Sequence, residues 1–76
     1  MSDLRPIATI RKNNSEEIRI SLAIRDGYSL IDMRVFSAPR GTHGEPMPTK
    51  AGICVNQAKL SELIQALQAA ERELAR

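Results

Sequence analysis

Apolar and polar residues alternate along residues 17–36, EIRISLAIRDGYSLIDMRVF. The Asp26-Gly27 pair within this run is the strongest short-range signal of a two-residue β-hairpin turn, because glycine accepts the positive φ that such a turn requires. Counting back from the turn fixes the register of both strands and sets Arg19 directly opposite Arg34. One face of the hairpin is then apolar and consists of Ile18, Ile20, Leu22, Ile24, Ile31, Met33 and Val35.

The other face of the hairpin is polar and aromatic, with Arg19, Ser21, Arg25, Tyr28, Asp32, Arg34 and Phe36. Like charges directly opposite each other on one face are mildly destabilising, so the facing arginines need compensation. Two explanations stay open. The arginines splay into water with Glu17 and Asp32 as diagonal neighbours, or they bind the phosphates of an anionic backbone.

Weaker signals flank the hairpin. Residues 1–5 have no periodicity and are expected to fray, whereas PIATIRK predicts a first strand. A turn at NNSE sets three pairs across the first two strands: Ile10 with Ile18, Ala8 with Ile20, and Arg11 with Glu17. Residues 37–50 hold three of the four prolines and predict a long surface loop, in which Arg40 and His43 are expected to be solvated.

The last third of the sequence predicts a strand and a helix. GICV is expected as a short fourth strand in which Cys54 is a buried or interface thiol, and Asn56 is a favoured helix N-cap. Apolar residues then recur at helical spacing: Leu60, Leu63, Ile64, Leu67, Ala70 and Leu74. We therefore expect one α+β domain over residues 1–76, a four-stranded antiparallel sheet (ββββα) with a C-terminal helix on its apolar face.

The predicted sheet is wider than its helix. Four strands at about 4.8 Å spacing span about 19 Å, whereas a helix is about 10 Å thick, so part of the apolar surface stays uncovered. A 76-residue chain buries only about 60% of its unfolded surface, and its single cysteine excludes an internal disulfide. A second copy of the chain is the expected remedy, and we predict a homodimer with C2 symmetry.

Composition narrows the function classes. The net charge of +2 and the pI near 9.1 favour anionic partners weakly. We find no leader, no apolar run long enough for a membrane, no glycine-rich phosphate loop and no cysteine or histidine near His43 at metal-ligand spacing. The lone histidine also lacks an assignable catalytic partner. We therefore expect an intracellular protein that is not an enzyme and holds neither cofactor nor metal.

Three runs in the sequence, EEIRISL, GYSLIDMRVF and PTKAGICVNQAKLSELIQAL, resemble the C-terminal domain of the transcriptional positive-cofactor-four family of single-stranded-DNA-binding coactivators. The resemblance covers residues 7–68. Its most specific part is LIDMR, followed at the right distance by a proline, a basic residue, GI, a polar N-cap and an amphipathic helix. The resemblance implies a dimer of curved four-stranded sheets that bind single-stranded or locally unwound DNA across their outer face, with little sequence preference.

The resemblance also implies roles for single residues. Arg34 matches a DNA-contacting arginine of the family's third strand, and Lys50 matches a basic position ahead of the fourth strand. Arg25 and Tyr28 flank the second turn, where the family usually places lysine and aromatic side chains. Three family positions are changed here, a tryptophan to Ser37 and two lysines to Asp26 and Ala51.

We expect a non-enzymatic module that binds single-stranded DNA at sites opened in transcription, replication or recombination. If the source is a bacterium or phage, we expect the protein in the cytoplasm or associated with the nucleoid. Phosphates would be neutralised by Arg19, Arg25, Arg34 and Lys50, and unstacked bases would meet Tyr28 and Phe36. Phe36 could instead enter the dimer interface. Transcription or replication proteins are further expected partners. The alternative function is a small dimeric protein-interaction or scaffold module that keeps the fold without strong DNA binding. Its sheet or edge strand would engage a protein partner, for instance by strand addition.

Overall fold

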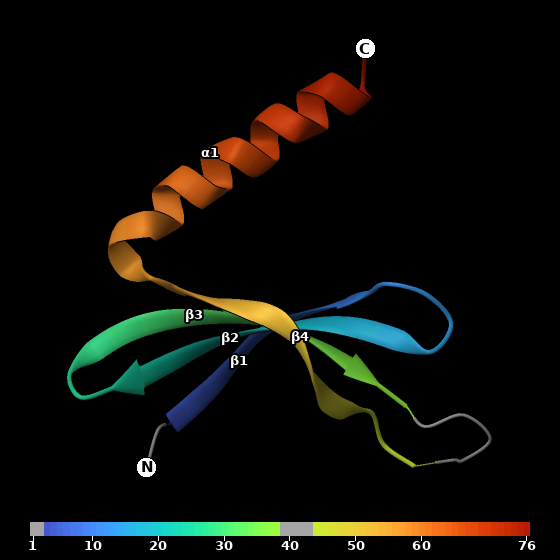
Figure 1. Cartoon of the computed structure of the whole chain (residues 1–76), viewed down its shortest axis with the longest axis vertical. Helices are drawn as coiled ribbons and strands as arrows, with labels where there is room; N and C mark the ends of the chain where they lie inside the picture. Colours follow the sequence, from blue (N-terminus) through green and yellow to red (C-terminus); the bar gives the residue numbers. More distant parts are fainter. Residues whose placement is uncertain (1–2, 39–43) are drawn as a thin grey trace.

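The computed structural model describes residues 3–38 and 44–76 (Figure 1). It contains four strands and one helix, namely β1 (Asp3–Arg11), β2 (Glu16–Arg25), β3 (Tyr28–Ser37), β4 (Met47–Asn56) and α1 (Gln57–Leu74). Neighbouring strands pair antiparallel in the order β1-β2-β3-β4, and the sheet is open and curved. The predicted ββββα fold is confirmed.

The β2–β3 hairpin has the register that its turn predicts. Asp26 and Gly27 both adopt positive φ, at 51° and 80°, as the favoured two-residue hairpin turn requires. Every predicted pair from Arg25 with Tyr28 to Ile18 with Val35 is present, including Arg19 with Arg34. The apolar and polar faces of the hairpin are therefore those that the sequence indicates.

β1 is longer than the sequence suggests. Its predicted pairing with β2 near the turn is confirmed, but the strand begins at Asp3, so the expectation that residues 1–5 fray is wrong for 3–5. These residues lack a periodic pattern of their own and pair with the last residues of β2, around Leu22–Ile24. The register shifts between Pro6 and Ala8, where a β-bulge suits an edge strand containing proline.

The connection between β3 and β4 is shorter than the predicted loop 37–50. Ser37 still belongs to β3 and β4 begins at Met47 rather than at GICV. The Thr49 hydroxyl donates to the Val35 carbonyl oxygen at 2.9 Å, which ties the early part of β4 to β3. Arg40 and His43 lie outside the described residues.

α1 begins where Asn56 predicts. The Asn56 side chain accepts a hydrogen bond from the backbone N–H of Lys59 at 3.0 Å, which satisfies one of the free donors of the first turn. The helix contacts β3 and β4 and then projects away from the sheet (Figure 1). No helical residue is buried in the single chain.

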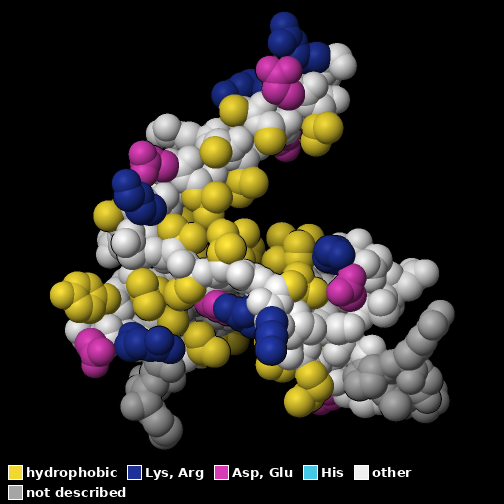
Figure 2. All heavy atoms as spheres, viewed as in Figure 1, with side chains coloured by type: hydrophobic (Ala, Val, Ile, Leu, Met, Phe, Trp, Pro, Cys, Tyr) yellow, Lys and Arg dark blue, Asp and Glu magenta, His cyan; other side chains and the backbone are white. Residues whose placement is uncertain are grey.

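The sheet has two unlike faces, which we call inner and outer. The inner face lies toward α1 and carries the apolar residues of the hairpin, such as Leu22 and Ile31, which share a hollow with Leu60 of the helix. Figure 2 shows hydrophobic side chains gathered along the helix and the sheet where the two face each other. The outer face is the opposite one and carries the facing arginines.

The single chain has almost no core. Among the described residues Ala23 alone is buried, while Ile24, Ile53, Ile64 and Leu67 are each about half exposed. The radius of gyration is 14.4 Å, whereas a compact chain of this length has about 11 Å. The apolar inner face and the helix are therefore left largely uncovered within one chain.

Two kinds of feature are absent from the described residues. No helix among them is both long enough and apolar enough to cross a membrane. Nor do residues 3–38 and 44–76 bring together three or more acidic, histidine or cysteine side chains in a way that could hold a metal ion.

Candidate nucleic-acid interface

Alternation along the strands places four arginines and two carboxylates on the outer face of β1–β3. The register gives this set as Arg11, Glu17, Arg19, Arg25, Asp32 and Arg34. Tyr28 and Phe36 share the face with them, because Tyr28 is opposite Arg25 and Phe36 is opposite Glu17. The outer face therefore combines excess positive charge with aromatic rings, which is the composition of a surface for single-stranded nucleic acid.

Arg34 is held by a carboxylate and by a carbonyl group. Its Nη2 donates to Oδ1 of Asp32 at 2.9 Å and its Nε to Oδ2 at 3.4 Å, so the two side chains meet fork to fork. Its Nη1 donates to the backbone oxygen of Thr49 on β4 at 3.3 Å. The hydrogen bond with the Asp32 carboxylate raises the pKa of Arg34 further above its usual range, so the guanidinium is always charged.

Arg19, on the neighbouring strand, turns to a different carboxylate. Its Nη2 lies 3.3 Å from Oε1 of Glu17, and its guanidinium carbon stands over the Phe36 ring, 4.1 Å from the ring centroid. The two facing arginines therefore do not share a counter-ion. Each has its own carboxylate two residues away on its own strand, which offsets the like-charge contact between β2 and β3.

Arg25 and Tyr28 lie together at the turn end of the hairpin. Tyr28 is 71% exposed, so its ring is open to a stacking partner. Both residues line a hollow of about 590 Å³ that continues over Asn56 to the start of α1. Arg25 forms no ion pair within residues 3–38 and 44–76. This end of the outer face therefore offers a cation and an exposed aromatic ring.

Lys50 lies at an irregular part of β4. It is exposed and belongs to the stretch between Pro48 and Gly52 where the β3–β4 register shifts. Thr49 beside it supplies the carbonyl that receives Arg34. Gly52 is opposite Arg34, and a Cβ atom there would come 2.5 Å from the Met33 carbonyl oxygen, so glycine permits the close approach of β4 to β3.

Cys54 is exposed, which makes the expectation of a buried thiol wrong for the single chain. It is opposite Asp32 on the outer face, because Ile53 and Val55 on either side of it have the opposite orientation. Together with Arg25, Arg34 and Asp32 it lines a groove of about 240 Å³. The thiol therefore lies among the charged groups of the candidate interface.

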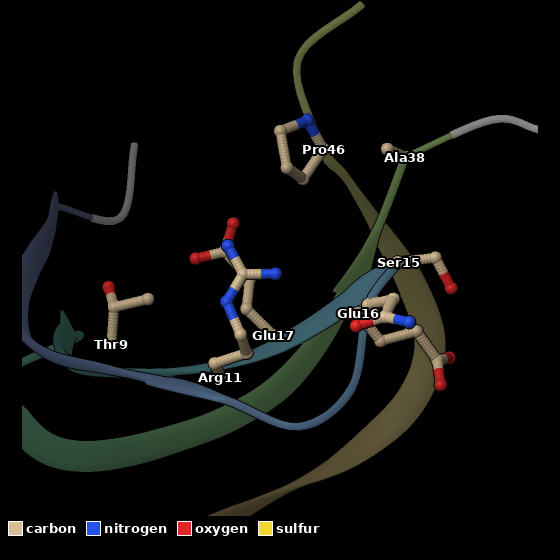
Figure 3. A pocket seen from close by; sticks show the side chains of 8 residues that line it. Thr9, Arg11, Ser15, Glu16, Glu17, Ala38 and Pro46 are labelled. Atoms are coloured by element: carbon tan, nitrogen blue, oxygen red, sulfur yellow. The ribbon is translucent and has the colours of Figure 1, made fainter. Parts of the chain in front are cut away.

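Another hollow, of about 390 Å³, lies where β1 turns into β2. Figure 3 shows Arg11 and Glu17 projecting into it from the two neighbouring strands, with Pro46 and Ala38 on its far side. Glu17 thus stands between Arg11, its partner across the strands, and Arg19 on its own strand. This carboxylate lowers the positive charge at this end of the outer face.

Five of the six candidate residues lie on the outer face of β2 and β3, namely Arg19, Arg25, Tyr28, Arg34 and Phe36. The sixth, Lys50, lies on β4 next to Thr49, whose carbonyl oxygen accepts a hydrogen bond from Arg34. Sequence reasoning missed the stacking of Arg19 on Phe36 and the contact of Arg34 with Thr49. The first could have been found, because Phe36 is a diagonal neighbour of Arg19 on the same face. The second depends on the irregularity in β4 and has no signal in the sequence.

These features place the protein in a class of small proteins that have an open ββββα fold and an arginine-rich outer face. No protein-family model and no curated protein matches the sequence. Two crystal structures of BPSL1147, described as a PC4 homolog from Burkholderia pseudomallei, do match. The tetragonal form has a TM-score of 0.79 and 30% identity over 91% of this chain and 98% of that chain. The orthorhombic form has a TM-score of 0.81 and 32% identity over 93% of each chain.

Because identity reaches 30% over nearly the whole of both chains, the protein belongs to the PC4-like family. This is the positive-cofactor-four family that the sequence resembles.

Proposed function

We propose that this protein is a non-enzymatic binder of single-stranded or locally melted DNA with little sequence preference. The observation that carries the proposal is the outer face, where Arg19, Arg25 and Arg34 lie with Tyr28 and Phe36 on one rigid β-hairpin. Membership of the PC4-like family supports the same function, which the sequence resemblance implies. Phosphates are bound by the cations and unstacked bases by the planar groups, so neither contact reads the sequence of the strand.

The working unit in this proposal is a homodimer. The inner face and the apolar side of α1 are left uncovered by one chain, with Ile53 at 48% and Leu67 at 53% exposure. A second copy related by C2 symmetry presents the same apolar surface, so the two copies can cover each other without any other partner. Pairing these inner faces leaves both outer faces free for DNA.

The proposed place of action is DNA opened during transcription, replication or recombination, at the nucleoid if the source is a bacterium or phage. Transcription or replication proteins would be met there as partners.

The proposal is tested by fluorescence anisotropy with a labelled oligo-dT, titrated at low and high salt and against a duplex of equal length. We expect the single strand to bind more tightly and the affinity to fall with salt. Arg34→Ala should lower the affinity and flatten the salt dependence by about one unit of slope, because one phosphate contact is lost. Arg72→Ala, which removes the same charge from an exposed position near the end of α1, is the matched control.

Absence of binding at low salt would overturn the proposal and favour the protein-interaction alternative. Equal losses from Arg34→Ala and Arg72→Ala would show that net charge, and not the outer face, governs binding.

A further inference from the structure

Arg19 and Phe36 form a single stacked unit on the outer face. The guanidinium carbon is 4.1 Å from the ring centroid, and the Glu17 carboxylate, 3.3 Å from Nη2, holds the group from the side. One face of the Phe36 ring is therefore covered by the protein itself. The Arg19 side chain is 38% exposed, so part of it is accessible to a ligand.

A hollow of about 290 Å³ adjoins this unit and runs from Phe36 across β2 to β1. Its lining includes the apolar side chains of Leu4 and Pro6 and the hydroxyl groups of Thr9 and Ser21. Hydroxyl groups both donate and accept hydrogen bonds, so they can meet the edge of any nucleobase. The hollow thus has the mixed apolar and polar lining that a flat, polar-edged base requires.

A guanidinium is planar and weakly hydrated, and arginine planes stack on bases as aromatic rings do. The Arg19 charge is already offset by Glu17, which would also repel a phosphate brought to the same point. Phe36 lies against one side of the guanidinium, and the Glu17 contact is made through Nη2. Arg34 is also paired with a carboxylate, so charge alone does not separate the two arginines. The Phe36 ring beneath Arg19 does, because it supports the guanidinium in a position that favours a base over a phosphate.

We propose that Arg19, supported on Phe36, is a base-stacking platform, and that the adjoining hollow receives the stacked base of a single strand. Phe36 acts as the support of the platform and not as its surface. The inference rests on the proposed function and changes the part of Arg19 from phosphate binding to base binding.

Arg19→Lys tests this directly, because lysine keeps the positive charge and removes the plane. Anisotropy is measured with oligo-dT and with an abasic strand of the same length, which has the phosphates but no bases. We expect Arg19→Lys to weaken oligo-dT binding by about tenfold, the loss of one stacked base, and to leave abasic binding and the salt slope unchanged. Arg34→Lys is the matched control and should affect both strands alike.

Phe36→Leu provides a second test, since it removes the support but no charge. It should weaken oligo-dT binding. The Arg19→Lys/Phe36→Leu double variant should have the same affinity as whichever single variant binds less tightly, because each change alone already disables the Arg19–Phe36 platform. Circular dichroism checks that each variant is folded.

The platform would be overturned if Arg19→Lys weakened binding of the two strands equally, or affected neither. The proposed function would still stand in that case, provided that the wild type bound oligo-dT in a salt-sensitive way. A wild-type protein that binds neither strand would overturn both.

Discussion

The two faces of the sheet differ in how many of their side chains find a partner within one chain. On the outer face Arg34 is held by Asp32 and Thr49, and Arg19 by Glu17 and Phe36, all within one molecule. On the inner face the apolar side chains and the helix lack a cover, and no helical residue is buried. Within one chain the charged side chains of the outer face are already held by their own contacts, whereas the apolar inner face is left largely uncovered.

Because of this contrast, substitutions on the two faces should affect different properties of the protein. A change on the inner face should act on assembly and stability, because buried apolar area is the main source of folding free energy. A change on the outer face should act on DNA binding and its salt dependence, because its ion pairs are partly exposed and contribute little to stability.

The largest effect is expected from Leu67→Asp on the inner side of α1. A carboxylate buried without a partner in the proposed dimer costs several kcal/mol, so the variant should fail to dimerise and should lose its cooperative thermal transition. Sedimentation velocity and circular dichroism measure the two effects. Gln65→Asp, two residues away and on the opposite side of the helix, should remain dimeric. A wild-type protein that sediments as a folded monomer would contradict the proposed use of the inner face.

The next largest effect is expected where β4 meets the outer face. In Gly52→Ala the new methyl group would lie 2.5 Å from the Met33 carbonyl oxygen and 3.0 Å from the Arg34 Cα. The strands must separate, so the free energy of unfolding should fall by about 1–3 kcal/mol, measured by urea denaturation. Ala51→Ser, at the exposed neighbouring residue, should leave it nearly unchanged. Unchanged stability in Gly52→Ala would mean that β4 does not approach β3 so closely.

A smaller effect, a gain in DNA affinity, is expected from Asp32→Asn. The substitution keeps the shape of the side chain and removes the charge that offsets Arg34 at 2.9 Å. Affinity for oligo-dT should rise by up to about fivefold at low salt, with a steeper salt dependence and little change in thermal stability. Weaker binding would show instead that Asp32 acts by orienting the guanidinium.

The smallest effect is expected at the β1–β2 turn, outside both faces. The Asn13 amide donates to the Glu16 carboxylate at 2.8 Å and the Lys12 ammonium lies 3.0 Å away, and these contacts lower the pKa of Glu16. A lowered pKa in the folded state means that this stabilisation is present above the pKa of the unfolded chain and is lost as the pH falls through the folded value. Acid unfolding of Glu16→Gln should therefore depend slightly less on pH, with DNA binding unaltered. An identical acid profile would show that the turn contributes nothing.

Much of the fold could be predicted because its strongest signals are local. The Asp26-Gly27 turn fixes the β2–β3 register, and with it the facing arginines, and Asn56 marks the start of the helix. The early start of β1 and the true start of β4 could not be predicted, because pairing with a neighbouring strand, and not their own periodicity, makes those residues extended.

The candidate site was predictable in its members but not in its contacts. Alternation along the strands puts Arg19, Arg34 and Phe36 on one face, as the structure has them. Which carboxylate each arginine chooses, and which arginine covers the ring, depends on side-chain conformations. The exposure of Cys54 follows from the same alternation, since its two neighbours face inward.

The single thiol of the chain offers the most direct test of the central claim that the outer face is the DNA surface. Cys54 is exposed on this face, in a groove with Arg25 and Arg34, so a bound strand should shield it. The rate of Cys54 alkylation by a neutral reagent would be measured with and without saturating oligo-dT, at low salt and again at high salt. Our account predicts slower alkylation with oligo-dT at low salt and no protection at high salt. An unchanged rate at low salt, under conditions where anisotropy shows the strand to be bound, would place the DNA elsewhere and contradict it.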